Sequence, residues 1–185
     1  MQAHIDNYFS SLKECIDRID KKEIEKLIEL LSDAKENGKQ IFVMGNGGSA
    51  STASHFCCEF NKGASFNKNK RFKVICLNDS VETLLAYSND ICFEDVFIEQ
   101  LKNFLGKNDI VIGISSSGNS KNILKAMEFA NSVGAITVGL TGMNGGKLKE
   151  LSQYSINPNY NDLQISEDIH MITVHILYRY FLTQD

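Results

Sequence analysis

The segment Ser115–Ser120 places four hydroxyl groups, an asparagine and a glycine in one short loop. It follows an apolar segment, residues 109–114, and leads into a helical pattern. Gly118 permits a tight turn, and the free N–H groups and the dipole at a helix start favour a bound anion. A helix cap needs only one such side chain, so this composition predicts a phosphate site. Because the loop contains no lysine, it is not a Walker-type loop.

A second loop, Gly45–Ser49, also joins an apolar segment to a helical pattern. Its glycines let a ligand approach the backbone closely. The spacing differs from the Gly-x-Gly-x-x-Gly pattern of dinucleotide sites, so no such cofactor is predicted. In an open α/β sheet, ligands bind beyond the carboxyl ends of the strands. The two loops are therefore predicted to form two walls of one pocket.

Two groups of ionisable residues can serve that pocket. His55 and Glu59 are four residues apart on a predicted helix, so they share one face. Apolar neighbours indicate that this helix is largely buried. A buried charge without a partner is costly, so a functional role for the pair is favoured over a purely structural one. The second group lies on the terminal helix and consists of Glu167, Asp168, His170 and His175. Histidine and carboxylate side chains suit a divalent metal such as zinc, and they are also the usual proton carriers in acid–base catalysis.

The spacing on the terminal helix limits what these residues can do together. Glu167 and His175 are eight residues apart, which corresponds to about 12 Å along a helix axis. Both therefore reach a single ion only if their side chains lean towards it. Of the other histidines, His170 is interpreted as structural and His4 as a surface residue.

The elements that must position these residues alternate along the chain. Helical periodicity covers residues 2–18, 22–37, 49–61, 80–88, 94–104, 120–133 and 163–182, and short apolar strands cover 40–44, 72–77, 109–114, 135–140 and 154–156. This alternation predicts an α/β fold, a three-layer sandwich with a five-stranded parallel sheet of the flavodoxin-like type. We expect one domain, residues 1–185. The two leading helices, residues 1–38, lie outside the alternation and are expected to contact a second subunit.

The composition narrows the class of protein. The 185 residues are 43% hydrophobic and 23% charged, with a net charge of −4. This charge argues against nucleic-acid binding by general electrostatics, and the one basic run, residues 68–73, is interpreted as a solvated loop before a strand. No apolar stretch is long enough to span a bilayer, and the N-terminus does not resemble a signal peptide. Five cysteines without a Cys-x-x-Cys pair suit a reducing cytoplasm.

Together the motifs resemble the sugar isomerase (SIS) domain and, more closely, its phosphoheptose isomerases. The resemblance covers nearly the whole chain, and it rests on Gly45–Ser49, His55 with Glu59, Ser88–Asp90, Ser115–Ser120 and residues 169–177. It implies a homotetramer with active sites at subunit interfaces. It also implies conversion of sedoheptulose 7-phosphate to D-glycero-D-manno-heptose 7-phosphate through an enediol, for bacterial lipopolysaccharide or capsule.

The resemblance also implies roles for particular residues. Glu59 matches the proton-abstracting glutamate and His175 its partner acid/base. The implied substrate contacts are Asn46, Gly47, Gly48, Ser49, Glu59, Asn89, Asp90, Ser115, Ser116, Ser117, Ser120 and Glu167. The implied zinc ligands are His55, Glu59, Glu167 and His175.

Two positions depart from the family pattern. Glu167 stands where the family commonly has glutamine, and a carboxylate only accepts hydrogen bonds. Lys62-Gly63 follows Glu59 in a region where better-known members have a Gly-Arg pair. Two alternatives stay open: a non-catalytic SIS-fold adaptor or regulatory protein, which should lack part of the acid–base set, and an isomerase of another sugar phosphate.

Overall fold

A computed structural model describes residues 1–184 and shows a five-stranded sheet in the order β2-β1-β3-β4-β5, with every pair parallel. The strands are β1 (Gln40–Gly45), β2 (Lys73–Cys76), β3 (Ile110–Ser115), β4 (Ile136–Thr141) and β5 (Tyr154–Ile156). The predicted α/β sandwich with a five-stranded parallel sheet is confirmed. The short fifth strand, which the sequence marked only weakly, pairs with β4 through Leu140 and Ile156.

Helices precede the sheet and connect its strands. They are α1 (Gln2–Asp17), α2 (Lys21–Asn37), α3 (Gly48–Cys58), α4 (Val81–Asp90), α5 (Val96–Phe104), α6 (Lys121–Val133), α7 (Gly146–Leu151) and α8 (Leu163–Leu182). A π-helix, η1 (Glu59–Gly63), continues α3, and a 3-10 helix, η2 (Phe93–Asp95), precedes α5. The sequence predicted one uninterrupted helix to residue 61. Instead, the backbone widens to π geometry at Glu59, a feature that is frequent at functional sites.

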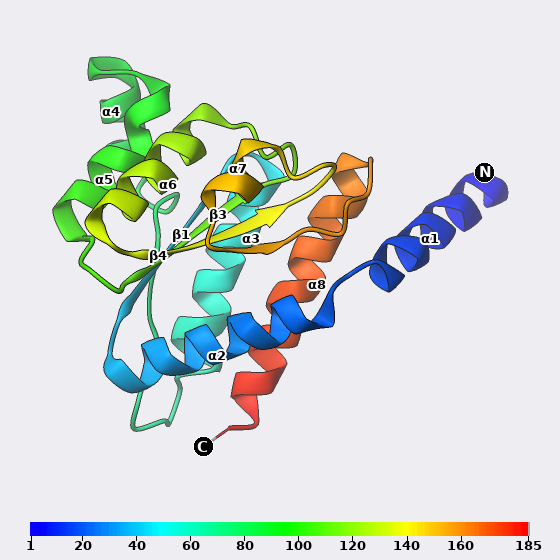
Figure 1. Cartoon of the computed structure of the whole chain (residues 1–185), viewed down its shortest axis with the longest axis horizontal. Coiled ribbons are helices and arrows are strands. Elements are labelled where there is room, and N and C mark those ends of the chain that lie inside the picture. The colour runs from blue at the N-terminus through cyan, green and yellow to red at the C-terminus, as the bar shows by residue number, and fades with distance from the viewer. Residues whose placement is uncertain (185) are drawn as a thin grey trace.

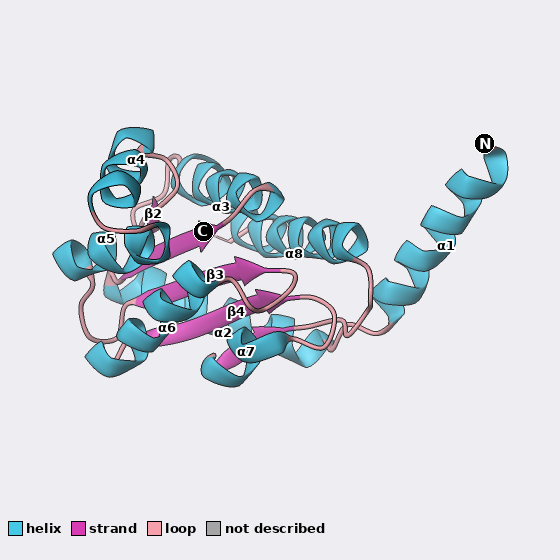
Figure 2. Ribbon diagram, turned by 90° about the horizontal axis from the view of Figure 1, so that it is seen from above, coloured by secondary structure: helices cyan, strands magenta, loops and turns pink. Residues whose placement is uncertain are grey.

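Alternating strand residues separate the two faces of the sheet. Ile41 and Val43 belong to a core that α2, α3 and α8 complete, whereas Phe42 and Met44 belong to a core with α5, α6 and α7. Successive strand side chains point to opposite faces, so a continuously apolar strand such as β1 must be covered on both. Figure 2 shows α3 and α8 on one side of the strands and α6 and α7 on the other.

The strand order brings the two predicted loops together. β1 pairs with β2 on one side and with β3 on the other. The order in which strands are added to the sheet therefore reverses at β1, while all strands stay parallel. Gly45, the last residue of β1, lies beside Ile114 of β3. The loops that follow these strands therefore begin next to each other at the carboxyl edge, the usual ligand position in this architecture.

The first helix, α1, projects from the body of the molecule (Figure 1). Its C-terminal part packs through Cys15 and Leu12 against Ile165 and Ile169 of α8, and the Tyr8 hydroxyl group donates to Asp168 of the same helix at 2.7 Å. Ile5 and Phe9, on one stripe of α1, are 43% and 57% exposed. No helix within residues 1–184 combines the length and apolarity needed to cross a bilayer.

Candidate functional site

The hydroxyl groups of the serine loop converge after β3. The Ser115 Oγ lies 3.1 Å from the Ser120 Oγ and 3.4 Å from the Ser117 Oγ. Ser120 is the N-cap residue of α6, but its side chain makes no capping hydrogen bond to the helix backbone. Its hydroxyl group instead joins the cluster, so the N-cap side chain caps none of the first N–H groups of α6, of which the Ile123 N–H donates to the Asn122 Oδ1 at 3.0 Å. The predicted phosphate loop thus combines converging donors with a helix start.

A cavity of about 210 Å³ lies against this loop. Its lining joins the serine loop to the glycine loop and α8, and consists of Asn46, Ser49, Ile114, Ser115, Ser116, Ser117, Ser120, Leu163 and Glu167. The Ser116 Oγ is buried and has no hydrogen-bond partner among the described residues. A buried hydroxyl without a partner is costly, so an acceptor such as a phosphate oxygen would satisfy it. The cavity suits a compact, oxygen-rich anion.

The glycine loop forms the opposite wall, as predicted. Gly47 has a φ of +56°, a conformation that side chains disfavour. A Cβ atom at Gly48 would lie 2.6 Å from the Glu167 Oε2, so only a glycine lets this carboxylate approach the start of α3. At a helix N-terminus a negative charge is stabilised by the dipole. Glu167 is therefore held at the wall formed by α3, across the cavity from the hydroxyl groups.

One residue that links the two walls, Asn122, was not predicted from the sequence. Asn122 on α6 is buried and exchanges two hydrogen bonds with Asn46, each of 2.9 Å. In the sequence, an asparagine in the first turn of a helix looks like an ordinary polar surface residue. Only the pairing of β1 with β3 shows that the two amides meet.

A second group of side chains lies further along α3 and α8. The His55 Nε2 is 3.0 Å from the His175 Nε2 and 3.7 Å from the Glu59 Oε1. The sequence predicted a largely buried setting. Phe56 and Phe60 are indeed buried, but His175 is exposed and His55 and Glu59 are only half-buried. The predicted acid–base residues Glu59 and His175 therefore both lie beside His55, at a face that is open in a single chain.

These two groups are separated within one chain. The cavity lining contains neither Glu59 nor His175. Ser49 and Glu59 are ten residues apart on α3 and its extension, which is about 15 Å along the axis. Glu167 stays with the cavity and does not join the histidines. Consistent with this, residues 1–184 contain no group of three His, Cys, Asp or Glu side chains placed to hold a metal ion.

The donor set nevertheless has the chemistry of a zinc site. The His55 Nε2 lies 3.0 Å from the His175 Nε2 and 3.7 Å from the Glu59 Oε1, so two imidazoles and a carboxylate are neighbours without surrounding a common ion position. These are ligand types that zinc takes, and an open fourth position is typical of catalytic sites. Of the four predicted ligands, Glu167 is the one that the chain does not bring to the other three.

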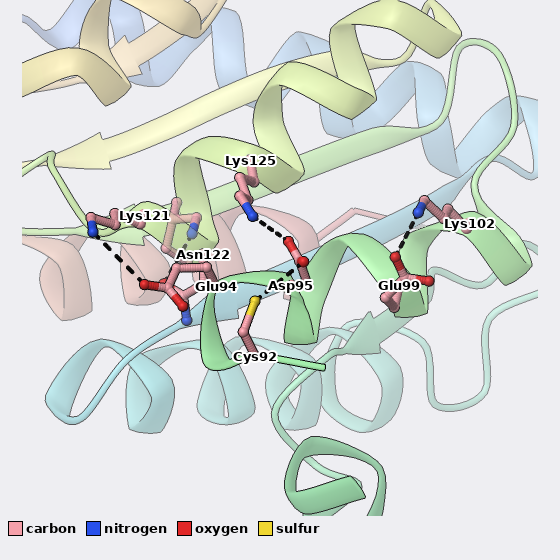
Figure 3. A network of polar contacts seen from close by, with 9 residues as sticks. Cys92, Glu94, Asp95, Glu99, Lys102, Lys121, Asn122 and Lys125 are labelled. Atoms are coloured by element: carbon pink, nitrogen blue, oxygen red, sulfur yellow. Dashed lines mark hydrogen bonds and ion pairs between the residues drawn. The ribbon is translucent and has the colours of Figure 1, made fainter. Parts of the chain in front are cut away.

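Asn89 and Asp90 lie outside the cavity. They are exposed at the end of α4, a helix without buried residues. The segment that follows is fastened to α6, because the Lys125 Nζ lies 2.6 Å from the Asp95 Oδ1 and the Cys92 thiol donates to Asp95 (Figure 3). The Lys125 ammonium, with Cys92, holds the pKa of Asp95 below its usual value. The network connects the Asn89–Asp90 segment to the helix that begins at the serine loop.

His170 is the structural residue that the sequence suggested. It is fully buried on α8, and its Nε2 donates to the Thr141 carbonyl oxygen at 3.0 Å, because a carbonyl group only accepts. Its Nδ1 has no partner among the described residues. Burial lowers the pKa of His170 to about 4. The bond ties α8 to the end of β4, behind the serine loop.

This burial predicts a loss of stability in mild acid. The folded-state pKa lies below the ordinary value of 6.5, so the unfolded chain binds a proton first as the pH falls. The free energy of unfolding should fall by roughly 3 kcal/mol between pH 6.5 and pH 4. Urea unfolding at both pH values should show a smaller pH effect in His170→Gln, which keeps a donor for Thr141. His4→Gln, on exposed α1, is the control. Equal pH effects in all three proteins would contradict the prediction.

Comparisons with known proteins identify the family of this chain. Residues 7–142 match the family model described as "SIS domain". A phosphoheptose isomerase from Helicobacter pylori is 40% identical over 154 residues, which cover 83% of this chain and 80% of that protein. One from Crocosphaera subtropica is 38% identical over 152 residues, which cover 82% and 77%.

Two solved structures resemble the whole chain. The phosphoheptose isomerase structure from Francisella tularensis has a TM-score of 0.91 at 26% identity and covers 99% of this chain and 98% of that one. The one from Neisseria gonorrhoeae has a TM-score of 0.88 at 25% identity and covers 97% of both chains. With a family model that spans most of the chain, and relatives at about 40% identity, the chain belongs to the phosphoheptose isomerase family of SIS-domain proteins.

Proposed function

We propose that this protein is a sugar-phosphate isomerase that converts sedoheptulose 7-phosphate to D-glycero-D-manno-heptose 7-phosphate. The isomerase class is supported by the relatives. The observation that carries the proposal is the presence, in one chain, of an anion-sized cavity with an orphaned hydroxyl at Ser116 and of a carboxylate–imidazole cluster at Glu59, with α3 and α8 contributing to both. A non-catalytic adaptor would not need the second group.

The serine loop would hold the phosphate as a handle. Its hydroxyl groups and the N–H groups at the start of α6 donate hydrogen bonds to phosphate oxygens, and no lysine or arginine lines the cavity. Because Glu167 is negatively charged, it is better suited to accept from the hydroxyl groups of the sugar than to contact the phosphate. Holding the phosphate end fixes where the reacting carbons can lie.

The cluster would then move the protons. Glu59 removes a proton from C1 of the open-chain ketose, the C1–H electrons form the C1=C2 bond, and the C2 carbonyl oxygen takes a proton to give the enediol. The His175 imidazole exchanges protons with the two oxygens. Loss of the O1 proton and return of a proton to C2 give the aldose. A zinc ion held by His55, Glu59 and His175 would add Lewis-acid polarisation of the carbonyl oxygen.

The separation of the two groups favours a site built from two subunits. An extended seven-carbon chain advances about 8 Å from C1 to C7 at ordinary bond lengths, whereas the groups of one chain are about 15 Å apart along α3. We propose that the cavity of one subunit faces the Glu59 cluster of another in a homotetramer. Glu167 would then complete the zinc ligands from across the interface. The apolar stripe on α1 would bury against a neighbouring subunit.

The proposal is tested by turnover of a panel of sugar phosphates. The purified protein should isomerise sedoheptulose 7-phosphate faster than hexose or pentose phosphates, measured with added zinc and after chelation. Turnover of another sugar phosphate alone would reassign the substrate. No turnover of any ketose phosphate, with zinc present and the tetramer intact, would overturn the isomerase assignment. We expect the enzyme to act in the reducing cytoplasm, consistent with five free cysteines, and to supply heptose for surface polysaccharide.

A further inference from the structure

The amide pair formed by Asn46 and Asn122 joins the glycine loop to α6. The Asn46 Nδ2 donates to the Asn122 Oδ1, and the Asn122 Nδ2 donates back to the Asn46 Oδ1, each at 2.9 Å. Asn46 lines the cavity against the serine loop, whereas Asn122 is 2% exposed and lies behind the lining. The Asn122 side chain can therefore act on a bound ligand through Asn46.

The backbone of α6 fixes the direction in which the Asn122 amide points. The Ile123 N–H group, in the first turn of the helix, donates to the Asn122 Oδ1 at 3.0 Å. Because this N–H group needs an acceptor, the Asn122 oxygen must lie on its side and the NH2 group on the other. A reversed amide would place two donors against each other. Main-chain atoms thus set the orientation of Asn122.

Asn122 in turn sets the orientation of Asn46. Two donors converge on the Asn122 Oδ1, namely the Ile123 nitrogen at 3.0 Å and the Asn46 Nδ2 at 2.9 Å. The NH2 end of Asn46 is therefore the end next to the start of α6, where the helix favours an anion. The pair uses one N–H group of this amide and leaves the second for a ligand. An Asn46 amide turned the other way would point its carbonyl oxygen there, against a phosphate oxygen.

We propose that Asn122 is a positioning residue that orients the Asn46 amide so that its second N–H group donates to the phosphate held by the serine loop. The proposal rests on the proposed function for the identity of the ligand, a sugar phosphate. Ionised phosphate oxygens only accept hydrogen bonds, whereas an amide has a donor at one end and an acceptor at the other. No lysine or arginine lines the cavity, so affinity depends on neutral donors that point their hydrogens at the anion.

The kinetic test compares wild type, Asn122→Leu and Asn131→Leu. Leucine has a similar volume but removes both bonds to Asn46, so KM for the sugar phosphate should rise about tenfold while kcat stays within about threefold. Asn131 is the matched control, because it lies on the same helix and bonds Thr137 and the Leu151 carbonyl oxygen instead. The control should keep its KM. An unchanged KM in Asn122→Leu, or an equal rise in both variants, would overturn the proposal.

A double-mutant cycle separates action through Asn46 from general damage. If Asn122 acts by orienting Asn46, then Asn122→Leu should raise KM little further in a chain that already carries Asn46→Ala. Rises in KM that multiply would overturn the proposal. Asn122→Ser is the second variant should the leucine protein fail to fold. Its hydroxyl group is too short to reach Asn46, so it should give the same pattern.

A binding measurement needs no turnover. Inorganic phosphate, titrated calorimetrically, should bind wild type and Asn131→Leu equally and Asn122→Leu about tenfold more weakly. Equal affinity in all three proteins, or no phosphate binding by wild type, would overturn the proposal. Weaker binding in Asn122→Leu alone, in a protein that turned over no sugar phosphate, would support the role of Asn122 and overturn the proposed function alone.

Discussion

Glu59→Gln should lower kcat for sugar-phosphate isomerisation by about a hundredfold to ten-thousandfold with little change in KM. The amide has nearly the same shape as the carboxylate but cannot take a proton from C1, and general-base catalysis contributes about 10²–10⁴-fold. Substrate binding depends on the distant serine loop and should persist. Steady-state kinetics on the best substrate of the panel measures both constants. The unfolding midpoint serves to confirm that the variant is folded.

Two outcomes would contradict this prediction. Glu128→Gln, at an exposed position on α6, is the matched control and should be indistinguishable from wild type. A comparable loss in both variants would reflect damage other than loss of the base. A Glu59→Gln protein within about tenfold of wild type would remove Glu59 from the chemistry.

The same variant tests whether the site is shared between subunits. Ser120→Asp should block phosphate binding by charge repulsion at the serine loop while leaving Glu59 intact. Co-expression of Glu59→Gln with Ser120→Asp should restore about a quarter of wild-type activity, because random mixing places an intact cavity opposite an intact base at that fraction of interfaces. If mixed tetramers form and stay inactive, each site is built from one chain.

Gly118→Ala should raise KM for the sugar phosphate at least about tenfold and lower the free energy of unfolding by about 3 kcal/mol. Gly118 has a φ of +65°, and a Cβ atom there would lie 2.0 Å from the Gly145 carbonyl oxygen. That atom is backbone and cannot rotate away, so the serine loop must shift. Kinetics and urea unfolding measure the two effects.

Gly134→Ala separates backbone strain from the clash. Gly134 has a similar φ of +82°, but the nearest atoms to an added Cβ belong to the flexible Lys107 side chain, 3.5 Å away. This variant should lose about 1 kcal/mol through its left-handed conformation and keep a normal KM. Similar KM values in both variants would show that the serine loop tolerates the methyl group, and that its geometry does not set substrate affinity.

Local chemistry made the fold and the position of the hydroxyl-rich loop predictable. The strand pattern of β1, the left-handed glycine that ends α2 at Gly38, and the hydroxyl-rich turn before α6 each depend on residues close in sequence. Hydrophobic periodicity and turn residues therefore identified the helices and strands and their order along the chain. Parallel pairing followed from the alternation of strands with helices. The pairing of the glycine and serine loops was also predictable, since loops at the carboxyl edge meet where the strand order reverses.

Pairwise meetings of distant side chains were not predictable in the same way. His55 and His175 are 120 residues apart in sequence and 3.0 Å apart in space. Their contact depends on how α3 packs beside α8, which the hydrophobic pattern does not specify residue by residue. The same packing places Gly48 against Glu167 and Gly63 against Tyr178. The sequence alone does not show which side chain packs against either glycine.

By itself, then, the sequence determined an α/β fold with a hydroxyl-rich loop suited to phosphate and a histidine–glutamate pair, because these depend on local periodicity and turn chemistry. Its motifs resembled the SIS domain, and the family comparisons then showed that the chain belongs to it. Only the tertiary structure decided that Glu167 belongs with the cavity, that Glu59 and His175 gather around His55 as a separate group, and that Tyr178 packs against Gly63. The reason is geometric. The position of α8 along the axis of α3 decides which residues of the two helices lie opposite each other, and the local sequence does not fix that position.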